Sequence, residues 1–144
     1  MESFDESIGF ATAQTHRMMF RAFTSYLRSF AITPEQWTVI KRLYTYGDLT
    51  QKQLVIAAEK DKATLTRIID LLQQKTLIKK RLNDEDKRSH YICLTEHGSQ
   101  LYKAVQPGTE QFYKDLVKDI STTDLANYMD TLQKLQEACR YHID

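Results

Sequence analysis

Three helix-start signals lie close together in the first half of the chain, and they limit its possible folds more than any other feature. Thr33 and Thr50 each stand three residues before a glutamine, Gln36 and Gln53, which is the spacing of a capping box. Asp61 offers a further N-cap shortly afterwards. Starts this near to one another leave room only for short helices joined by tight turns. The sequence therefore predicts a compact group of three helices.

Long helices are predicted on both sides of this group. Apolar residues recur every three or four positions over residues 5–30, which predicts one long N-terminal helix. In the C-terminal third, Thr95 is a predicted N-cap of another long helix, and the run STTD at 121–124 starts the last one. The Pro107-Gly108 pair lies inside the first of these two, so we expect a kink or break there.

A short charged segment separates the three-helix group from the C-terminal helices. Residues 77–82 and 91–94 are apolar runs with some alternation, and a charged loop joins them, which predicts a β-hairpin. Together with the helices this gives a fold class that is mainly α with a small β-hairpin. Helix, turn and helix followed by a hairpin is the order of a winged helix-turn-helix.

Composition excludes several other classes of protein. The chain has 144 residues, 42% of them hydrophobic and 27% charged, as in an ordinary soluble domain. No apolar run approaches the ~20 residues that span a bilayer, and the acidic start MESFDESIGF does not resemble a signal peptide. The two cysteines, Cys93 and Cys139, lie far apart and suit free thiols in a reducing compartment. We therefore expect a cytoplasmic protein with no membrane partner.

Charge is unevenly distributed along the chain. Residues 60–90 hold nine bases and five acids, a local net charge of +4 in a chain whose total is only +1. A basic middle between acidic flanks is typical of a protein that binds double-stranded DNA. A solvated charged face would look similar, so charge alone does not decide between the two interpretations.

The third helix of the group carries the side chains expected to meet DNA. Its buried stripe is predicted to be Leu65, Ile68, Ile69 and Leu72. In a helix-turn-helix this helix enters the major groove, with its N-terminal residues near base edges. Short side chains, threonine and arginine suit that position. The predicted contacts are Lys62, Ala63, Thr64, Thr66 and Arg67. An ordinary amphipathic helix would also have a polar outer face, so this helix is not decisive alone.

The hairpin adds a second candidate contact, because its loop is strongly charged. Arg81 lies on one strand, and Lys87 and Arg88 lie near the start of the return strand. A narrow minor groove attracts arginine, so we expect Arg88 to project into the groove beside the recognition helix. We expect Asp86 to turn inward and brace the loop, by accepting backbone N–H bonds or by pairing with a base.

These motifs, taken in order, resemble the core of the multiple antibiotic resistance regulator (MarR) family. The resemblance covers residues 47–98 most clearly. It is carried by D-x-R at Asp86 and Arg88, followed by L-T-x-x-G ending at Gly98, and by DKATLTR at the start of the recognition helix. TPEQW at the start of the first helix of the group is also similar to the family's second helix.

The resemblance implies a fold, a function and a set of site residues. It implies a winged-helix DNA-binding lobe over residues 34–94 and a helical dimerisation lobe over residues 1–32 and 95–144, together a single domain spanning 1–144. It also implies a homodimeric, ligand-responsive repressor on a pseudo-palindromic operator. Carried over residue by residue, the major groove contacts are Thr64, Thr66 and Arg67, the minor groove contact is Arg88, and the wing brace is Asp86.

Two positions depart from the family pattern. Thr76 stands where the family usually has glycine after the recognition helix. If the backbone there is left-handed, a β-branched residue would cost about 1–2 kcal/mol. Val55 replaces a small alanine in the short helix and would widen the packing between helices. Either change would alter the pitch of the recognition helix without changing the fold.

Other functions are less well supported by the sequence. His90, Cys93 and His97 are close in sequence and are zinc-ligand types, but they straddle a strand end and a helix start with no fourth ligand nearby. We expect no metal and no cofactor. No phosphate loop, nucleophile elbow or H-E-x-x-H motif is present, so we expect no enzyme. The alternative function is a winged-helix protein-interaction module without specific DNA binding.

The resemblance also implies an effector site in a crevice between the two lobes. Related proteins often bind small aromatic acids between their lobes. Candidate lining residues, which are equally plausible core residues, are His16, Met19, Phe20, Phe23, Trp37 and Tyr44. One branch of the family senses peroxide through a cysteine in the first helix, and this chain has none there, so that mechanism is not expected.

Overall fold

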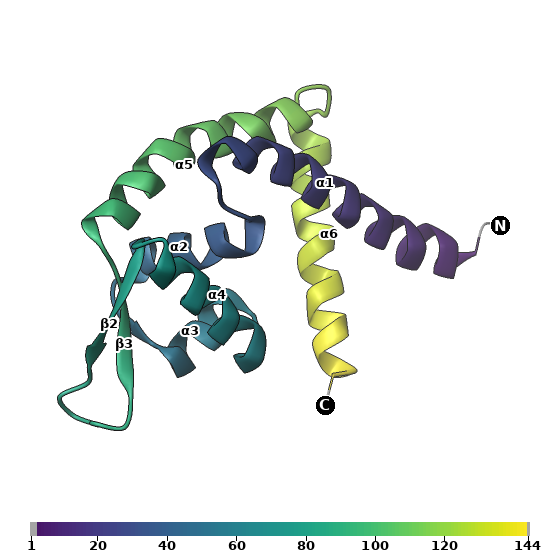
Figure 1. Cartoon of the computed structure of the whole chain (residues 1–144). Helices are drawn as coiled ribbons and strands as arrows, with labels where there is room; N and C mark the ends of the chain where they lie inside the picture. The colour runs from purple at the N-terminus through teal and green to yellow at the C-terminus, as the bar shows by residue number, and fades with distance from the viewer. Residues whose placement is uncertain (1–2, 144) are drawn as a thin grey trace. The chain divides into compact units, whose positions relative to one another are not determined.

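The computed structural model describes residues 3–143 and consists of helices with one small sheet (Figure 1). The chain divides into two compact units, one ending at Gly108 and one starting at Thr109. The first unit begins with a π-helical segment, Asp5–Phe10, which continues into α1, Ala11–Leu27, and a 3₁₀ turn, Arg28–Phe30. The long N-terminal helix predicted from the sequence is therefore present over nearly its whole length.

The three-helix group forms as its start signals predict. Its members are α2 (Pro34–Tyr46), α3 (Gln51–Ala58) and α4 (Lys62–Gln74). Both capping boxes are complete. The Thr33 side chain accepts from the Gln36 backbone N–H, and the Gln36 side chain accepts from the Thr33 backbone N–H. Thr50 and Gln53 make the same pair of hydrogen bonds. Asp61 caps α4 by accepting a hydrogen bond from the backbone N–H of Thr64.

The core of the first unit lies among these helices and the sheet. The predicted stripe of α4 is entirely buried. Other fully buried side chains come from α1, α2, α3 and the two longer strands: Leu27, Ile40, Leu54, Ile78 and Ile92. Burial of the stripe leaves the opposite face of α4 exposed, so the recognition helix is held rigidly by its inner side.

The sheet has one strand more than the predicted hairpin. β2 (Ile78–Leu82) and β3 (His90–Leu94) form the antiparallel hairpin, in register from Ile78 opposite Leu94 to Leu82 opposite His90. β1 (Leu49–Thr50) pairs with the other edge of β3, giving the order β1-β3-β2. A strand of two residues has no periodicity, and its partner is about forty residues away, so the sequence pattern did not reveal it.

The prediction of a kink or break at Pro107-Gly108 is corrected, because α5 (Glu96–Leu116) runs through both residues without interruption. Proline removes one backbone hydrogen bond from a helix. The hydroxyl of Tyr26 on α1 donates a hydrogen bond of 2.8 Å to the carbonyl of Val105 in the turn before the proline. Gly108 makes this possible, because a Cβ there would lie 2.1 Å from the Tyr26 hydroxyl oxygen.

The turn after α4 adopts the conformation that the family's glycine would favour. Thr76 has φ +60°, which lies in the left-handed region. Its hydroxyl donates to the carbonyl of Lys75 and lies 3.0 Å from Nδ1 of His97. Its own carbonyl accepts a hydrogen bond from the Thr95 hydroxyl. These bonds hold a β-branched residue in a conformation that disfavours it.

The second unit contains the end of α5 and the last helix, α6 (Thr122–Tyr141). Ser121 caps α6 by accepting from the backbone N–H of Asp124, so the predicted start is correct. Many of its apolar side chains are exposed in the single chain, among them Tyr128, Met129 and Leu135. Among residues 3–143, no helix is both long enough and apolar enough to span a membrane.

Candidate nucleic-acid interface

The first turn of α4 is fixed by Asp61. Its Oδ1 accepts from the backbone N–H of Thr64 at 2.8 Å, and its Oδ2 accepts from the Thr64 hydroxyl at 2.9 Å. These two hydrogen bonds lower the pKa of the Asp61 carboxyl. Lys62 and Ala63 follow directly and are exposed. The Thr64 hydroxyl therefore donates its hydrogen to Asp61, a contact that the sequence analysis does not predict.

Thr66 is also engaged within the protein. Its hydroxyl donates to the carbonyl of Lys62 at 2.8 Å, one turn earlier in α4. Nε2 of Gln51, the first residue of α3, donates to the same hydroxyl oxygen at 2.7 Å. Gln51 thus joins the two helices of the helix-turn-helix at their outer surface, a role that its sequence position alone gave no reason to expect.

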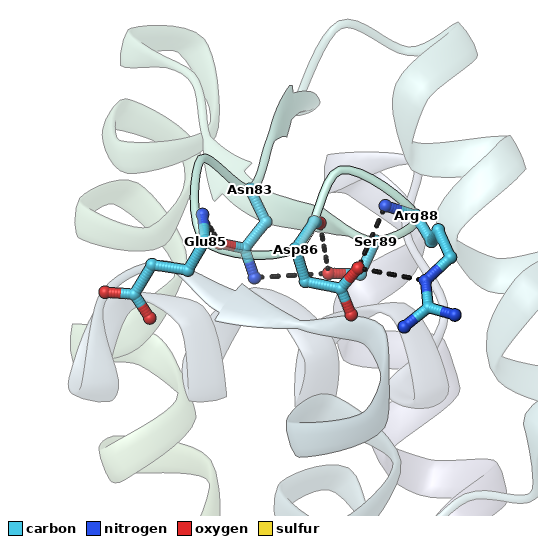
Figure 2. A network of polar contacts seen from close by, with 5 residues as sticks. All are labelled: Asn83, Glu85, Asp86, Arg88 and Ser89. Atoms are coloured by element: carbon cyan, nitrogen blue, oxygen red, sulfur yellow. Dashed lines mark hydrogen bonds and ion pairs between the residues drawn. The ribbon is translucent and has the colours of Figure 1, made fainter.

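The wing loop is organised around a buried asparagine (Figure 2). Asn83 is only 8% exposed. Its Nδ2 donates to the Ser89 hydroxyl at 3.1 Å, its Oδ1 accepts from the backbone N–H of Glu85 at 3.0 Å, and its own backbone N–H donates to the Ser89 carbonyl. Ser89 in turn donates to the carbonyl of Asp86 through both its backbone N–H and its hydroxyl. Asn83 and Ser89 therefore close the base of the loop.

Asp86 accepts a hydrogen bond from the backbone of the wing loop. Its Oδ1 accepts from the backbone N–H of Arg88 at 3.1 Å, which is a local brace across the loop tip. The same oxygen lies 3.3 Å from Nε of Arg88, so it also pairs with the side chain that was expected to reach DNA. The Arg88 side chain is nevertheless 94% exposed. Figure 2 shows it projecting away from the loop.

Arg81 is held at the base of the wing. Its guanidinium lies 3.3 Å from Oδ2 of Asp48, next to β1, and 4.3 Å above the centre of the Tyr91 ring. Burial and the neighbouring Asp48 carboxylate raise the pKa of the Cys93 thiol on the adjacent strand. Arg81 was predicted to contact DNA. In this structure its ion pair with Asp48 links β2 to the residue before β1, on the other side of β3.

A hollow of about 790 Å³ lies between α3, the start of α4 and the wing. Four basic side chains line it, and Asp86 is the one acid among its lining residues; the bases are Lys52, Lys62, Lys80 and Arg88. Two apolar side chains of α3, Val55 and Ile56, also face it, and Ile56 is 73% exposed. The surface is concave, basic and partly apolar, which suits a phosphate backbone and the sugar edges beside it.

The structure groups some of the predicted contacts and separates others. Lys62 and Arg88 share the hollow. Arg67 is exposed but lines a different depression of about 260 Å³, which includes Phe20 and Thr24 of α1. Lys87 lies on the exposed loop tip. Lys80 on β2 also lines the hollow. Lys52 does too and was missed, although its charge and its place near Thr50 are visible in the sequence.

The weaker site hypotheses can be placed as well. In the part of the chain that the structure describes, no three His, Cys, Asp or Glu side chains are grouped as metal ligands. Cys93 is buried and Cys139 is exposed. Of the candidate effector-lining residues, Phe23 and Trp37 are core, Met19 is half-buried, and Tyr44 stacks on Tyr102 with ring centres 3.8 Å apart.

His16 and Phe20 do line a surface hollow. Its volume is about 630 Å³, and its lining includes Arg17 and Arg21 on α1 and Glu35 on α2. Two guanidinium groups beside an aromatic ring and an imidazole make a surface that suits a small aromatic anion. All of these residues belong to the first compact unit.

The fold and the basic hollow together define a winged helix-turn-helix protein of the DNA-binding class. The model of the MarR family matches residues 32–90. The Bacillus subtilis organic hydroperoxide resistance transcriptional regulator is 32% identical over 107 residues, which cover 73% of this chain and 73% of that protein. This chain therefore belongs to the MarR family of transcriptional regulators. The family is not enzymatic, so the expectation that the chain is not an enzyme is confirmed.

Solved structures agree with this fold. A mutant MarR from E. coli in complex with operator DNA superposes with a TM-score of 0.85 at 24% identity, over 94% of this chain and 99% of that one. The S. aureus MepR–DNA complex superposes with a TM-score of 0.86 at 23% identity, over 91% of this chain and 97% of that one. The predicted fold class is therefore confirmed.

Proposed function

We propose that this regulator is a ligand-responsive repressor that binds a pseudo-palindromic operator as a homodimer. The observation that carries the proposal is the basic hollow between α3, the start of α4 and the wing. Lys52, Lys62 and Lys80 supply positive charge for phosphates, which fixes the protein's register on the duplex. The exposed outer face of α4 then meets the major groove, and the wing meets the minor groove.

Each predicted contact has a place in this arrangement. Lys62, Ala63, Thr64, Thr66 and Arg67 form the recognition surface of α4. Arg88 is the minor groove contact, because its side chain is almost fully exposed at the loop tip. Lys87 adds charge beside it. Arg81 anchors the base of the wing through Asp48 and adds to its positive potential.

The proposed dimer is supported by exposed apolar side chains on the terminal helices. Phe4, Ile8, Phe10 and Met18 are exposed in the first unit, and Tyr128, Met129, Leu135 and Tyr141 in the second. Exposed apolar side chains of this size and number on helices favour an interface with another chain. We accordingly assign residues 34–94 to a DNA-binding lobe, and residues 1–32 and 95–144 to a dimerisation lobe.

The proposed effector site is the hollow along α1 lined by His16, Arg17, Phe20 and Arg21. A small aromatic acid fits its chemistry, since the ring can stack and the carboxylate can pair with arginine. Hydroperoxide sensing, named for the Bacillus subtilis relative, is not carried over, because the cysteines of this chain are at positions 93 and 139. A thermal-shift screen of phenolic acids, followed by release from DNA, tests this site.

Selection from a random-sequence duplex library tests the proposed function directly. We expect an enriched sequence with two related half-sites, bound about 1,000-fold or more tightly than a scrambled duplex. Half-sites separated by about one helical turn fit a two-fold symmetric protein. If no sequence is enriched, the operator proposal is wrong and the chain is better regarded as a protein-interaction module.

A further inference from the structure

We propose that Thr66 recognises a thymine in the major groove through its methyl group and not through its hydroxyl. The proposal deepens the proposed function, on which it rests, because it assigns a base to one position of the recognition helix. It comes from the two hydrogen bonds that the Thr66 side chain makes within the protein.

The hydroxyl of Thr66 has little hydrogen-bonding capacity left. A threonine hydroxyl has one hydrogen to donate and two lone pairs that accept. The hydrogen is directed at the carbonyl of Lys62, 2.8 Å away. Because that hydrogen is already used, the amide of Gln51 must be the donor in the 2.7 Å contact between the two side chains. One lone pair remains, so the hydroxyl has no hydrogen available for a base or a phosphate.

Thr66 is exposed even though its hydroxyl is occupied. Both hydroxyl partners belong to the protein, one in the same helix and one at the start of α3. The part of the side chain left to meet a ligand is therefore its methyl group. Lys62 and Gln51, which hold the hydroxyl, both line the basic hollow, so Thr66 is bonded to two residues of the surface that we assign to DNA.

Among the four bases, thymine alone presents a methyl group in the major groove, and a threonine methyl is a good partner for it. Burying a methyl-sized apolar group is equivalent to about a fourfold change in affinity. Thr64 differs, because its hydroxyl is bonded to the Asp61 cap and its side chain is half-buried. Of the two threonines, Thr66 is therefore the one placed to discriminate between bases.

The test uses the operator obtained by library selection and replaces its thymines one at a time by deoxyuridine, which lacks only the methyl group. With the native protein, we expect one substitution in a half-site to weaken binding about fourfold. Thr66→Val keeps the methyl and loses the hydroxyl, and should still discriminate thymine from deoxyuridine at that position. Thr66→Ser keeps the hydroxyl and loses the methyl, and should bind both duplexes equally.

The outcomes are distinct. If no deoxyuridine substitution weakens binding by the native protein, the methyl contact does not exist. If Thr66→Ser still discriminates thymine from deoxyuridine as strongly as the native protein does, another side chain contacts the thymine methyl and the proposal is overturned. Both results require that an operator has been selected and bound. Failure to select one would count against the proposed function instead.

Discussion

Asp86 makes two contacts with Arg88, and under the proposed function we expect them to act in opposite directions on DNA binding. Its Oδ1 accepts from the Arg88 backbone N–H, which orders the loop, and also pairs with the Arg88 side chain, which competes with DNA for that guanidinium. The pair is exposed at the loop tip, so its electrostatic strength is small and falls with salt. The brace and the competition can be separated by substitution.

Asp86→Asn should bind operator more tightly than the native protein. An asparagine oxygen can still accept from the Arg88 backbone, while the negative charge that holds the guanidinium is gone. Asp86→Ala removes the brace as well, and we expect it to weaken binding by about 1 kcal/mol. Fluorescence anisotropy on one operator measures both changes.

Glu85→Ala is the matched control for charge, because Figure 2 shows the Glu85 carboxylate directed away from the Asp86–Arg88 contact. It should tighten binding modestly. If Asp86→Ala and Glu85→Ala tighten binding by similar amounts, Asp86 does not brace the wing.

Asn83 and Ser89 should act on DNA binding as a pair. Each single change, Asn83→Ala or Ser89→Ala, opens the base of the loop and should weaken operator binding by about 1 kcal/mol. The double variant should lose less than the sum, leaving a coupling of about 0.5 kcal/mol or more in the binding free energy. Strict additivity in anisotropy titrations would show that the two residues do not hold Arg88 as a unit.

At the scale of elements, the turn between α4 and β2 determines how the recognition helix joins the wing. The Thr95 hydroxyl donates to the carbonyl of Thr76 and accepts from the backbone N–H of Gly98. A Cβ at Gly98 would lie 2.1 Å from the carbonyl oxygen of Leu77, so that position accepts only glycine without movement. Through Thr95 and Gly98, the L-T-x-x-G motif thus holds the start of α5 against the turn that follows α4.

Thr76 offers a test of how this turn tolerates a left-handed residue. Thr76→Val keeps the β-branch and removes the hydroxyl bonds, so the free energy of unfolding should fall by about 1–2 kcal/mol. Thr76→Gly loses the same bonds but relieves the backbone strain, and should cost less. Urea denaturation compares the two variants. A valine variant at least as stable as the glycine variant would contradict this account of the turn.

The elements were predictable wherever a local signal defined them. Capping boxes at Thr33 and Thr50 gave the start of two helices, and apolar spacing gave the buried face of α4. The contact of Tyr26 with the α5 turn before Pro107 was not predictable, because it joins residues about eighty positions apart. Local rules for proline include no such partner.

The candidate site was predictable in its residue types more than in its contacts. The sequence predicts DNA contacts on α4 and on the wing from side-chain type and position. The structure brings two of them, Lys62 and Arg88, to one hollow. Partners that depend on the folded chain were missed. Gln51 reaches Thr66, and Asp48 reaches Arg81, across loops that no sequence periodicity connects. Asn83 was not among the predicted residues, and its burial and hydrogen bonds make it central to the wing.

At the scale of the whole molecule, the proposed dimer predicts a change of oligomeric state. Leu135 is 38% exposed in the single chain, so an aspartate there need not unfold the second unit but would place a charge in the interface. We expect Leu135→Asp to dissociate the dimer and to lose operator binding. The neighbouring Gln136→Asp adds the same charge and should remain dimeric. Sedimentation equilibrium decides, and a native protein that is monomeric at micromolar concentration while bound to operator would refute the dimer.

We propose above that the basic hollow is the surface that binds DNA. Its most direct test is the salt dependence of operator affinity for the double variant Lys62→Ala/Lys80→Ala. Each lost phosphate contact should reduce the slope of log affinity against log salt by about 0.9, so the double variant should lose nearly twice that. Lys114→Ala/Lys118→Ala removes the same charge from the second unit and should leave the slope unchanged. Equal slopes for the native protein and both double variants would contradict the assignment of this surface.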